Sequence, residues 1–370
     1  MSSTLIATPL APTGIPRVYK CKCDRPVFFT NSVCLACKTA LGYEPNLASI
    51  FPLREGAEPS SWLLTGSSST SLYRHCSNAT SASACNWLTP WDSGVDGRCI
   101  SCRLNRTIPN LSDASNGERW RKIEVAKRRL VSSLLMLGLP VIPRDEDPNV
   151  GLGFDFLRPD QEKVLTGHAG GIITLNIEEA DDATREGIRE RLHEPYRSLL
   201  GHLRHEVGHY YWDRLILDSP WIDRFRELFG DERADYNEAL QLHYKQPKSD
   251  WQEHFVSAYA SSHPWEDWAE TWAHYLHVGD TLNTSSSFGV NIESVEMSFE
   301  GFTEDTLCQP DDDFLHFVNA WVRFTAVLNE ICRSMGLPDF YPFVLTKSSI
   351  RKLHFVHLVV LNRHAGLECH

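Results

Sequence analysis

The sequence predicts an α+β protein in which a small cysteine-rich module precedes a larger, mainly helical domain with a small β-sheet. Three observations support this fold class. Eight of the eleven cysteines fall within the first 102 residues. A strand-like apolar run covers residues 172–177, and most of the chain beyond it places apolar residues at helical intervals. At 370 residues the chain also exceeds what one hydrophobic core usually spans, so we expect more than one folding unit.

Three regions follow one another along the chain. Residues 1–16 are rich in Ser, Thr, Ala and Pro, which predicts a flexible tail. In residues 17–110, short apolar stretches alternate with Cys, Gly, Pro and Ser, which is typical of a loop-rich module held together by metal. Residues 111–370 then form the main domain.

The elements of the main domain follow from its apolar spacing and its breakers. A helix is expected over 118–139, where Pro140 stops it, and the strand over 172–177 follows Gly170-Gly171. The segment from 185 to 217 has a helical pattern that Pro195 divides into two helices. Further helices are expected at 221–229, 233–243, 265–278 and 312–335.

The charge distribution bears on the partners of the protein. The net charge is −12, and residues 1–102 hold 8 basic and 6 acidic side chains, which leaves 28 basic and 42 acidic ones beyond them. Because an acidic surface repels phosphate, we do not expect the main domain to bind nucleic acid, whereas the near-neutral N-terminal region leaves that role open.

The sequence was also read for membrane-spanning helices and for a signal peptide. No run approaches the roughly eighteen apolar residues of a membrane-spanning helix, so we expect no membrane partner. Residues 1–20 show no basic start followed by an apolar block, as a signal peptide would. We therefore expect a cytoplasmic protein.

The motif His205-Glu206-Val207-Gly208-His209 lies within the second of the two helices divided by Pro195. Residues four apart share one helix face, so both imidazoles can reach one Zn²⁺, and Glu206 lies beside them as the general base that takes a proton from water. Apolar neighbours such as Leu203 and Tyr211 suit a buried active-site helix. His202 is expected to pack or to support the site, because a catalytic zinc keeps one position open.

The third metal ligand must come from elsewhere. A histidine in the same helix is excluded, because the HExxHxxGxxH motif needs Gly and His at the positions where the chain has Trp212 and Leu215. Glu266 on a later helix is our predicted ligand, and Glu270, four residues on, is predicted to accept a hydrogen bond from a metal-bound imidazole. Other acidic residues remain open as alternatives, although each has basic neighbours: Glu227, Asp231 and Glu232.

The cysteines of the N-terminal region predict two further metal sites. Four thiolates close a tetrahedral structural zinc site, and iron can occupy such a site as well. Cys21, Cys23, Cys34 and Cys37 form the first set, within seventeen residues. Cys76, Cys85, Cys99 and Cys102 form the second set, in which only the last two make a CxxC knuckle. We therefore expect one catalytic and two structural zinc ions.

Several strings carry a resemblance to a known family: Cys34 to Tyr43, Cys85 to Leu88, Cys99 to Pro109, Arg204 to Trp212, Glu266 to His277 and Tyr341 to Leu345. On these strings the chain resembles zinc-binding metallopeptidases that carry an N-terminal zinc-ribbon region, and the resemblance covers nearly all of it. It implies zinc ribbons over 17–110, a zincin-like peptidase domain over 111–370, a bound zinc, and the roles given above to His205, Glu206 and His209.

Two functions are compatible with these features. The first is a zinc-dependent peptidase that hydrolyses polypeptides, with ribbons that are structural or that dock a protein partner or the substrate. The second is a catalytically silent zinc-binding scaffold that acts through its ribbons. Glu206 favours the peptidase, because a residue that is not a ligand has no chemical use at a site without turnover.

Overall fold

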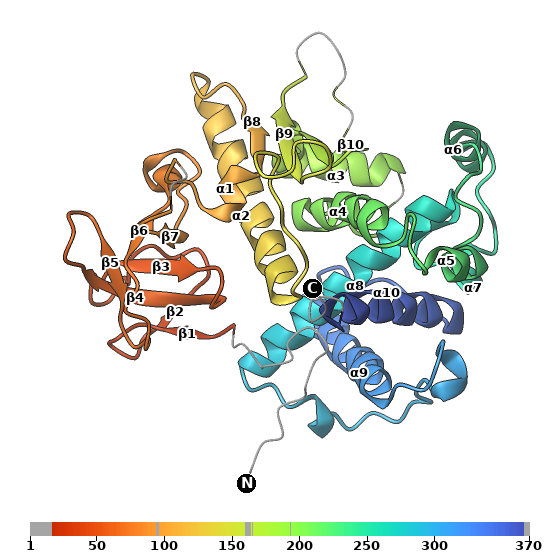
Figure 1. Ribbon diagram of the computed structural model, residues 1–370. Coiled ribbons are helices and arrows are strands. Elements are labelled where there is room, and N and C mark those ends of the chain that lie inside the picture. Colours follow the sequence, from red (N-terminus) through yellow and green to blue (C-terminus); the bar gives the residue numbers. More distant parts are fainter. Residues whose placement is uncertain (1–16, 94–95, 160–163, 165, 193, 366–370) are drawn as a thin grey trace. The chain divides into compact units, whose positions relative to one another are not determined.

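The computed structural model describes residues 17–93, 96–159, 164, 166–192 and 194–365 (Figure 1). The predicted tail over 1–16 lies outside these residues. The chain divides into two compact units, Gly14–Arg185 and Glu186–His370, which we call the N-terminal and C-terminal units. The predicted domain boundary between residues 110 and 111 falls inside the N-terminal unit and stays a prediction.

The cysteine-rich part of the N-terminal unit is built from short antiparallel strands. A hairpin, β1 (Tyr19–Lys20) and β2 (Pro26–Val27), comes first. A five-stranded sheet follows, in the order β3 (Leu41–Glu44), β4 (Ser49–Glu55), β5 (Trp62–Leu64), β6 (Tyr73–His75) and β7 (Leu88–Pro90). Tyr43 and Trp87 are fully buried beside it, with ring centroids 4.8 Å apart. The core here is small, as expected for a module that depends on metal.

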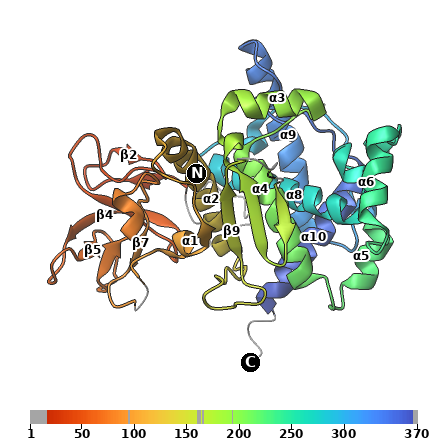
Figure 2. The same cartoon turned by 90° about the horizontal axis from the view of Figure 1, so that it is seen from above.

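A helix and a second sheet complete this unit. The short α1 (Ile100–Arg103) leads through β8 (Asn105–Thr107) to α2 (Ala114–Met136). The second sheet has the order β10 (Gly167–Ala169), β11 (Ile172–Asn176), β9 (Gly153–Leu157) and β8. Strands β8 and β9 are parallel, and parallel neighbours need a long crossover, which contains α2. Figure 2 shows α2 beside β9.

The predicted elements of this region agree with the structure. The helix expected over 118–139 is α2, which begins four residues earlier because the Asp113 carboxylate caps it by accepting a hydrogen bond from the Ser115 N–H. The strand expected over 172–177 is β11. The parallel pairing of β11 with β9 had no signal in the local pattern. The fold class is confirmed, with small sheets and a mainly helical remainder.

The C-terminal unit is helical. Its helices are α4 (Leu199–Leu215), α5 (Ile222–Phe229), α6 (Tyr236–Lys245), α7 (Trp251–His254), α8 (Pro264–Ser287), α9 (Asp312–Ser334) and α10 (Lys347–Ala365). Helix α3 (Asp182–Leu192) spans the division between the units. Pro195 lies between α3 and α4, so the predicted break is confirmed. Helix α10 is an addition to the predicted set.

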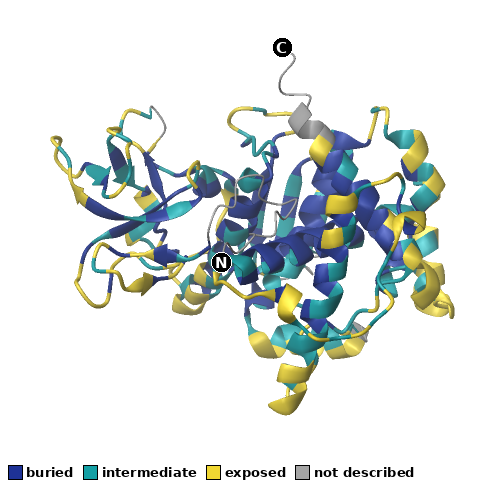
Figure 3. Ribbon diagram, turned by 90° about the horizontal axis from the view of Figure 1, so that it is seen from below, coloured by how far each residue is buried: buried dark blue, intermediate teal, exposed yellow. Residues whose placement is uncertain are grey.

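Helix α8 is the central element of this unit and packs against both α4 and α10 (Figure 1). Its side chains Trp268, Trp272 and Tyr275 are fully buried. Gly208 of α4 allows the close approach, since a Cβ at this position would lie 3.1 Å from the Cα of Ala269. Figure 3 shows the buried residues gathered where helices pack and the exposed ones on outer turns and loops. This crossing brings α4, which carries His205, Glu206 and His209, against α8, which carries Glu266.

Among the described residues, no helix combines the length and the apolar character that crossing a bilayer requires.

Candidate metal centre

Three side chains from two helices converge where α4 crosses α8. His205 and His209 project from α4, and their Nε2 atoms are 3.2 Å apart. Oε2 of Glu266, in the first turn of α8, lies 2.9 Å from Nε2 of His205 and 3.5 Å from Nε2 of His209. All three residues are buried. The structure thus brings the three residues predicted as ligands to one point.

The spacing of these atoms fits a zinc ion. Ligand atoms about 2.0–2.1 Å from a tetrahedral centre stand about 3.3–3.4 Å from one another, which is close to the three separations found here. Oε2 of Glu266 is buried and has no hydrogen bond among the described residues. A buried carboxylate oxygen that faces two imidazole nitrogens is the donor set that zinc prefers, and the residues present therefore fit the ion.

The alternative acidic residues lie elsewhere. Asp231 pairs with Arg233 at 2.8 Å, and Glu232 pairs with Arg226 at 2.6 Å. Glu227 is exposed on α5. The only histidine–carboxylate group that meets the ligand spacing within the described ranges contains Glu266.

Outer residues orient the ligands. Nδ1 of His205 donates a hydrogen bond to Oε1 of Glu270 at 2.7 Å, which leaves its Nε2 directed at the metal position. The Ser257 hydroxyl holds the other oxygen of Glu270 at 2.6 Å. The Tyr236 hydroxyl donates to Oε1 of Glu266 at 2.5 Å. Each carboxylate therefore has one oxygen on the imidazole side and one held by a hydroxyl.

Glu206 is buried beside this group and is held by a chain of donors. Nη2 of Arg197 lies 3.4 Å from Nδ1 of His202, and Nε2 of His202 lies 3.2 Å from Oε1 of Glu206. Arginine can only donate, so Nδ1 of His202 accepts and its Nε2 carries the hydrogen that it donates to Glu206. This bond leaves the second oxygen of Glu206 available for a proton.

The electrostatics of the cluster favour a bound cation. Burial lowers the pKa of His205, but the adjacent carboxylates of Glu266 and Glu270 outweigh it and raise that pKa well above its usual value. Burial raises the pKa of Glu266, yet the neighbouring His209 and His205 hold it well below its usual value. Burial likewise raises the pKa of Glu206, and the His202 hydrogen bond together with His205 lowers it overall. The carboxylates are therefore ionised, and positive charge is stabilised between them.

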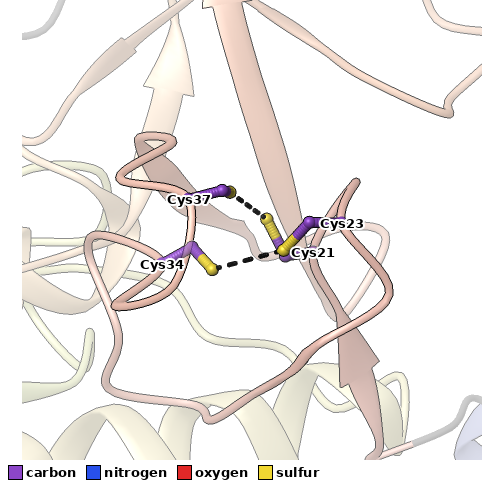
Figure 4. A group of neighbouring side chains, drawn as sticks. All are labelled: Cys21, Cys23, Cys34 and Cys37. Atoms are coloured by element: carbon purple, nitrogen blue, oxygen red, sulfur yellow. Dashed lines mark hydrogen bonds between the residues drawn. The ribbon is translucent and has the colours of Figure 1, made fainter.

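The first cysteine set comes together near β1 and β2 (Figure 4). The sulfurs of Cys21 and Cys37 are 3.5 Å apart, and those of Cys23 and Cys34 are 3.8 Å apart. Four thiolates about 2.3 Å from one tetrahedral ion stand about 3.8 Å apart, whereas a disulfide needs about 2.05 Å. Hydrogen bonds from Thr39 lower the pKa of Cys37 to about 6, which favours the thiolate. This set fits a structural metal.

The second set is more deeply buried. Cys76 follows β6, Cys99 is the N-cap of α1 and Cys102 lies within α1. The sulfurs of Cys85 and Cys99 are 3.7 Å apart, and the Cys99 N–H donates to the sulfur of Cys76 at 3.3 Å. All four sulfurs lie within 4.8 Å of one another. The irregular spacing in sequence is thus compatible with one tetrahedral site.

Comparison with known families assigns both parts of the chain. Residues 116–359 match the family described as "putative zinc-binding metallo-peptidase", and residues 18–113 match that of a zinc-ribbon domain. The first match alone covers more than half of the chain. The chain belongs to this metallopeptidase family. Zinc binding is therefore supported by both family descriptions and by the two groups of four cysteines.

Relatives of this metallopeptidase family member occur in mycobacteria. Uncharacterised proteins of Mycobacterium bovis and Mycobacterium tuberculosis are each 41% identical to it over 340 residues, which is 91% of this chain and 93% of the relative. No solved structure matches the chain.

Sequence reasoning gave His202 a supporting role but missed two other residues that support the site in this family member, Tyr236 and Ser257. The bond between His202 and Glu206 had a signal, because the two are four residues apart on one helix. Tyr236 and Ser257 had none, since each reaches its carboxylate partner from a different segment. Only the path of the chain reveals these two contacts.

Proposed function

We propose that the protein is a zinc-dependent peptidase whose catalytic ion is held by His205, His209 and Glu266 and whose general base is Glu206. One observation carries the proposal. Glu206 is buried on α4 beside the ligand His205 in sequence, and a hydrogen bond from His202 orients it although it is not itself one of the three ligands. A site that only stored metal would have no use for this oriented carboxylate.

The chain's own residues account for the proton steps of hydrolysis. Zinc, when bound here, supplies Lewis acidity that polarises a peptide carbonyl and makes water easier to deprotonate. Glu206 accepts the proton of the attacking water on its free oxygen and returns it to the departing amine. Its other oxygen stays hydrogen-bonded to His202, so the carboxylate keeps its orientation through both transfers. Glu270 keeps the ring of His205 in place.

The two groups of four cysteines are proposed to hold structural zinc, and the ribbons to dock a protein partner or the polypeptide substrate. Neither set is paired in disulfides, and such thiols persist in reducing compartments. For this reason we propose the cytoplasm as the site of action.

The test is hydrolysis of unfolded polypeptides by the purified, zinc-loaded protein. Glu206→Gln keeps the size and burial of the side chain and removes its basicity, so we expect proteolysis to fall by about 10²–10⁴-fold. Zinc content should remain at the wild-type level, because residue 206 is not a ligand. Wild-type protein should lose activity with a chelator and regain it with added zinc.

The matched control is Glu227→Gln, which changes an exposed glutamate of the same unit and should leave the rate unchanged. Equal cleavage by wild type and Glu206→Gln would exclude the proposed mechanism. Absence of cleavage by the zinc-loaded wild type on a broad set of polypeptides would favour the silent scaffold instead.

A further inference from the structure

Tyr236 stands at the start of α6, a helix that is otherwise at the surface. None of the residues of α6 is buried, and Leu242 and Tyr244 on it are 60% and 62% exposed. The inward direction of its first residue is therefore a local feature and not part of a buried helix face. Instead, the Tyr236 hydroxyl donates a hydrogen bond of 2.5 Å to Oε1 of Glu266.

We propose that Tyr236 is a positioning residue for the metal: its hydroxyl fixes the carboxylate of Glu266 so that Oε2 faces the two imidazoles. This inference rests on the metal site of the proposed function. It implies that α6, through Tyr236, raises the affinity of that site for zinc.

The two oxygens of Glu266 show how the tyrosine acts. Oε1 takes the hydrogen bond from Tyr236, whereas Oε2 has none among the described residues and lies 2.9 Å from Nε2 of His205. Glu266 is only 1% exposed, so water cannot readily replace a missing donor at Oε1. Without the hydroxyl, the carboxylate is free to rotate or to turn Oε1 toward the ion, and the ligand geometry is no longer enforced.

The ring of Tyr236 is held separately from its hydroxyl. Its centroid lies 5.3 Å from that of His263 and 6.1 Å from that of Trp265, both at the start of α8. His263 is the N-cap of α8 and also approaches the Ala234 carbonyl, with Nε2 at 3.1 Å. These contacts hold the ring when the hydroxyl is removed. Tyr236→Phe therefore removes the hydroxyl and its bond to Glu266 while the ring keeps these contacts.

The experiment measures zinc affinity instead of hydrolysis. Full-length protein is loaded with zinc, and the ion is withdrawn by titration with a chromogenic chelator of known affinity. His205→Ala identifies which of the bound ions belongs to this site: we expect three zinc ions per wild-type chain and two in the variant. Tyr236→Phe should then lower the affinity for that one ion by about 10–100-fold, with the ribbon zincs unaffected.

The control is Tyr244→Phe, which removes a hydroxyl from an exposed position of the same helix and should leave zinc affinity within twofold of wild type. Circular dichroism and the melting temperature establish that both variants are folded. If Tyr236→Phe unfolds, Tyr236→Leu with zinc affinity measured below its melting temperature replaces it, and the same loss is expected.

The outcomes separate this inference from the proposed function. A folded Tyr236→Phe protein with wild-type affinity overturns the role of the tyrosine and leaves the metal site intact. If His205→Ala loses no zinc, the metal site itself is wrong, and the inference falls with it. Peptidase activity enters neither result, so absence of catalysis would not affect the conclusion.

Discussion

Pairs of residues four apart in sequence recur at the candidate site. His205 and His209 form one pair on α4, and His202 and Glu206 form another on the same helix. Glu266 and Glu270 form the third pair, on α8. Because each pair shares a helix face, only two helices need to cross correctly to assemble six functional side chains.

Glu270 provides the first prediction at the scale of one residue. Glu270→Gln keeps an acceptor for Nδ1 of His205 but removes the negative charge, so the imidazole becomes a weaker donor to the metal. We expect zinc affinity at this site to fall by about 10–100-fold, measured by chelator competition. Glu227→Gln is the control. A larger loss in the control would transfer the ligand role to that alternative glutamate.

At the scale of elements, the crossing of α4 and α8 decides the geometry. Gly208 lies at the crossing, and its carbonyl accepts a hydrogen bond from the Trp268 indole N–H at 2.9 Å. An added Cβ would lie 3.1 Å from the Ala269 Cα and 3.3 Å from the Ala269 carbonyl oxygen, both backbone atoms that cannot move aside independently. The absence of a side chain at residue 208 therefore sets how close His209 and Glu266 come.

The second prediction follows from this crossing. Gly208→Val adds three carbons between the helices, so we expect about 1–3 kcal/mol of lost stability by denaturant unfolding and a loss of the zinc that His205→Ala also loses. Gly187→Val on α3 is the control, because a Cβ there meets nothing within 4 Å. Full zinc binding by Gly208→Val would show that the ligand geometry does not depend on this contact.

At the scale of the whole molecule, the C-terminal unit contains buried histidines outside the metal site. Burial lowers the pKa of His357 to about 4, and its Nδ1 is 3.0 Å from the Tyr275 hydroxyl. Asp311 lies 3.6 Å from its Nε2 and is shared with His354. Burial also lowers the pKa of His274 to about 4. These rings are therefore neutral in the folded state near pH 7.

Acid sensitivity is the third prediction. An unfolded histidine has a pKa of about 6.5, so between pH 6.5 and about 4 only the unfolded chain takes up the proton. The free energy of unfolding is therefore highest above pH 6.5. As the pH is lowered from 6.5 to about 4, it falls by about 1.4 kcal/mol per pH unit for each such histidine. The double variant Tyr275→Phe/His357→Phe removes one of them together with its partner. Between pH 6.5 and about 4, the slope of its unfolding free energy against pH should be smaller than that of wild type by about 1.4 kcal/mol per pH unit. An unchanged slope would contradict the low pKa of His357.

Much of the local structure could be predicted because its causes are local. Helix α2, strand β11 and the break at Pro195 follow from apolar spacing and from breakers within a few residues. The parallel pairing of β8 with β9 could not be predicted in this way, since 48 residues lie between the paired residues Asn105 and Phe154 and neither strand's own sequence identifies its partner. Helix α10 was not predicted and is known only from the structure.

The amino-acid sequence by itself determined the HExxH face and the acidic pair Glu266 and Glu270, because helix geometry converts a spacing of four into a shared face. It also determined the two sets of four cysteines, since the members of each set lie within a short stretch of chain. Only the tertiary structure decided that Glu266 lies against the imidazole of His205 and that Tyr236 donates a hydrogen bond to it. Those contacts depend on how whole helices pack, which is the sum of many weak interactions along an interface and is not encoded by any short stretch of residues.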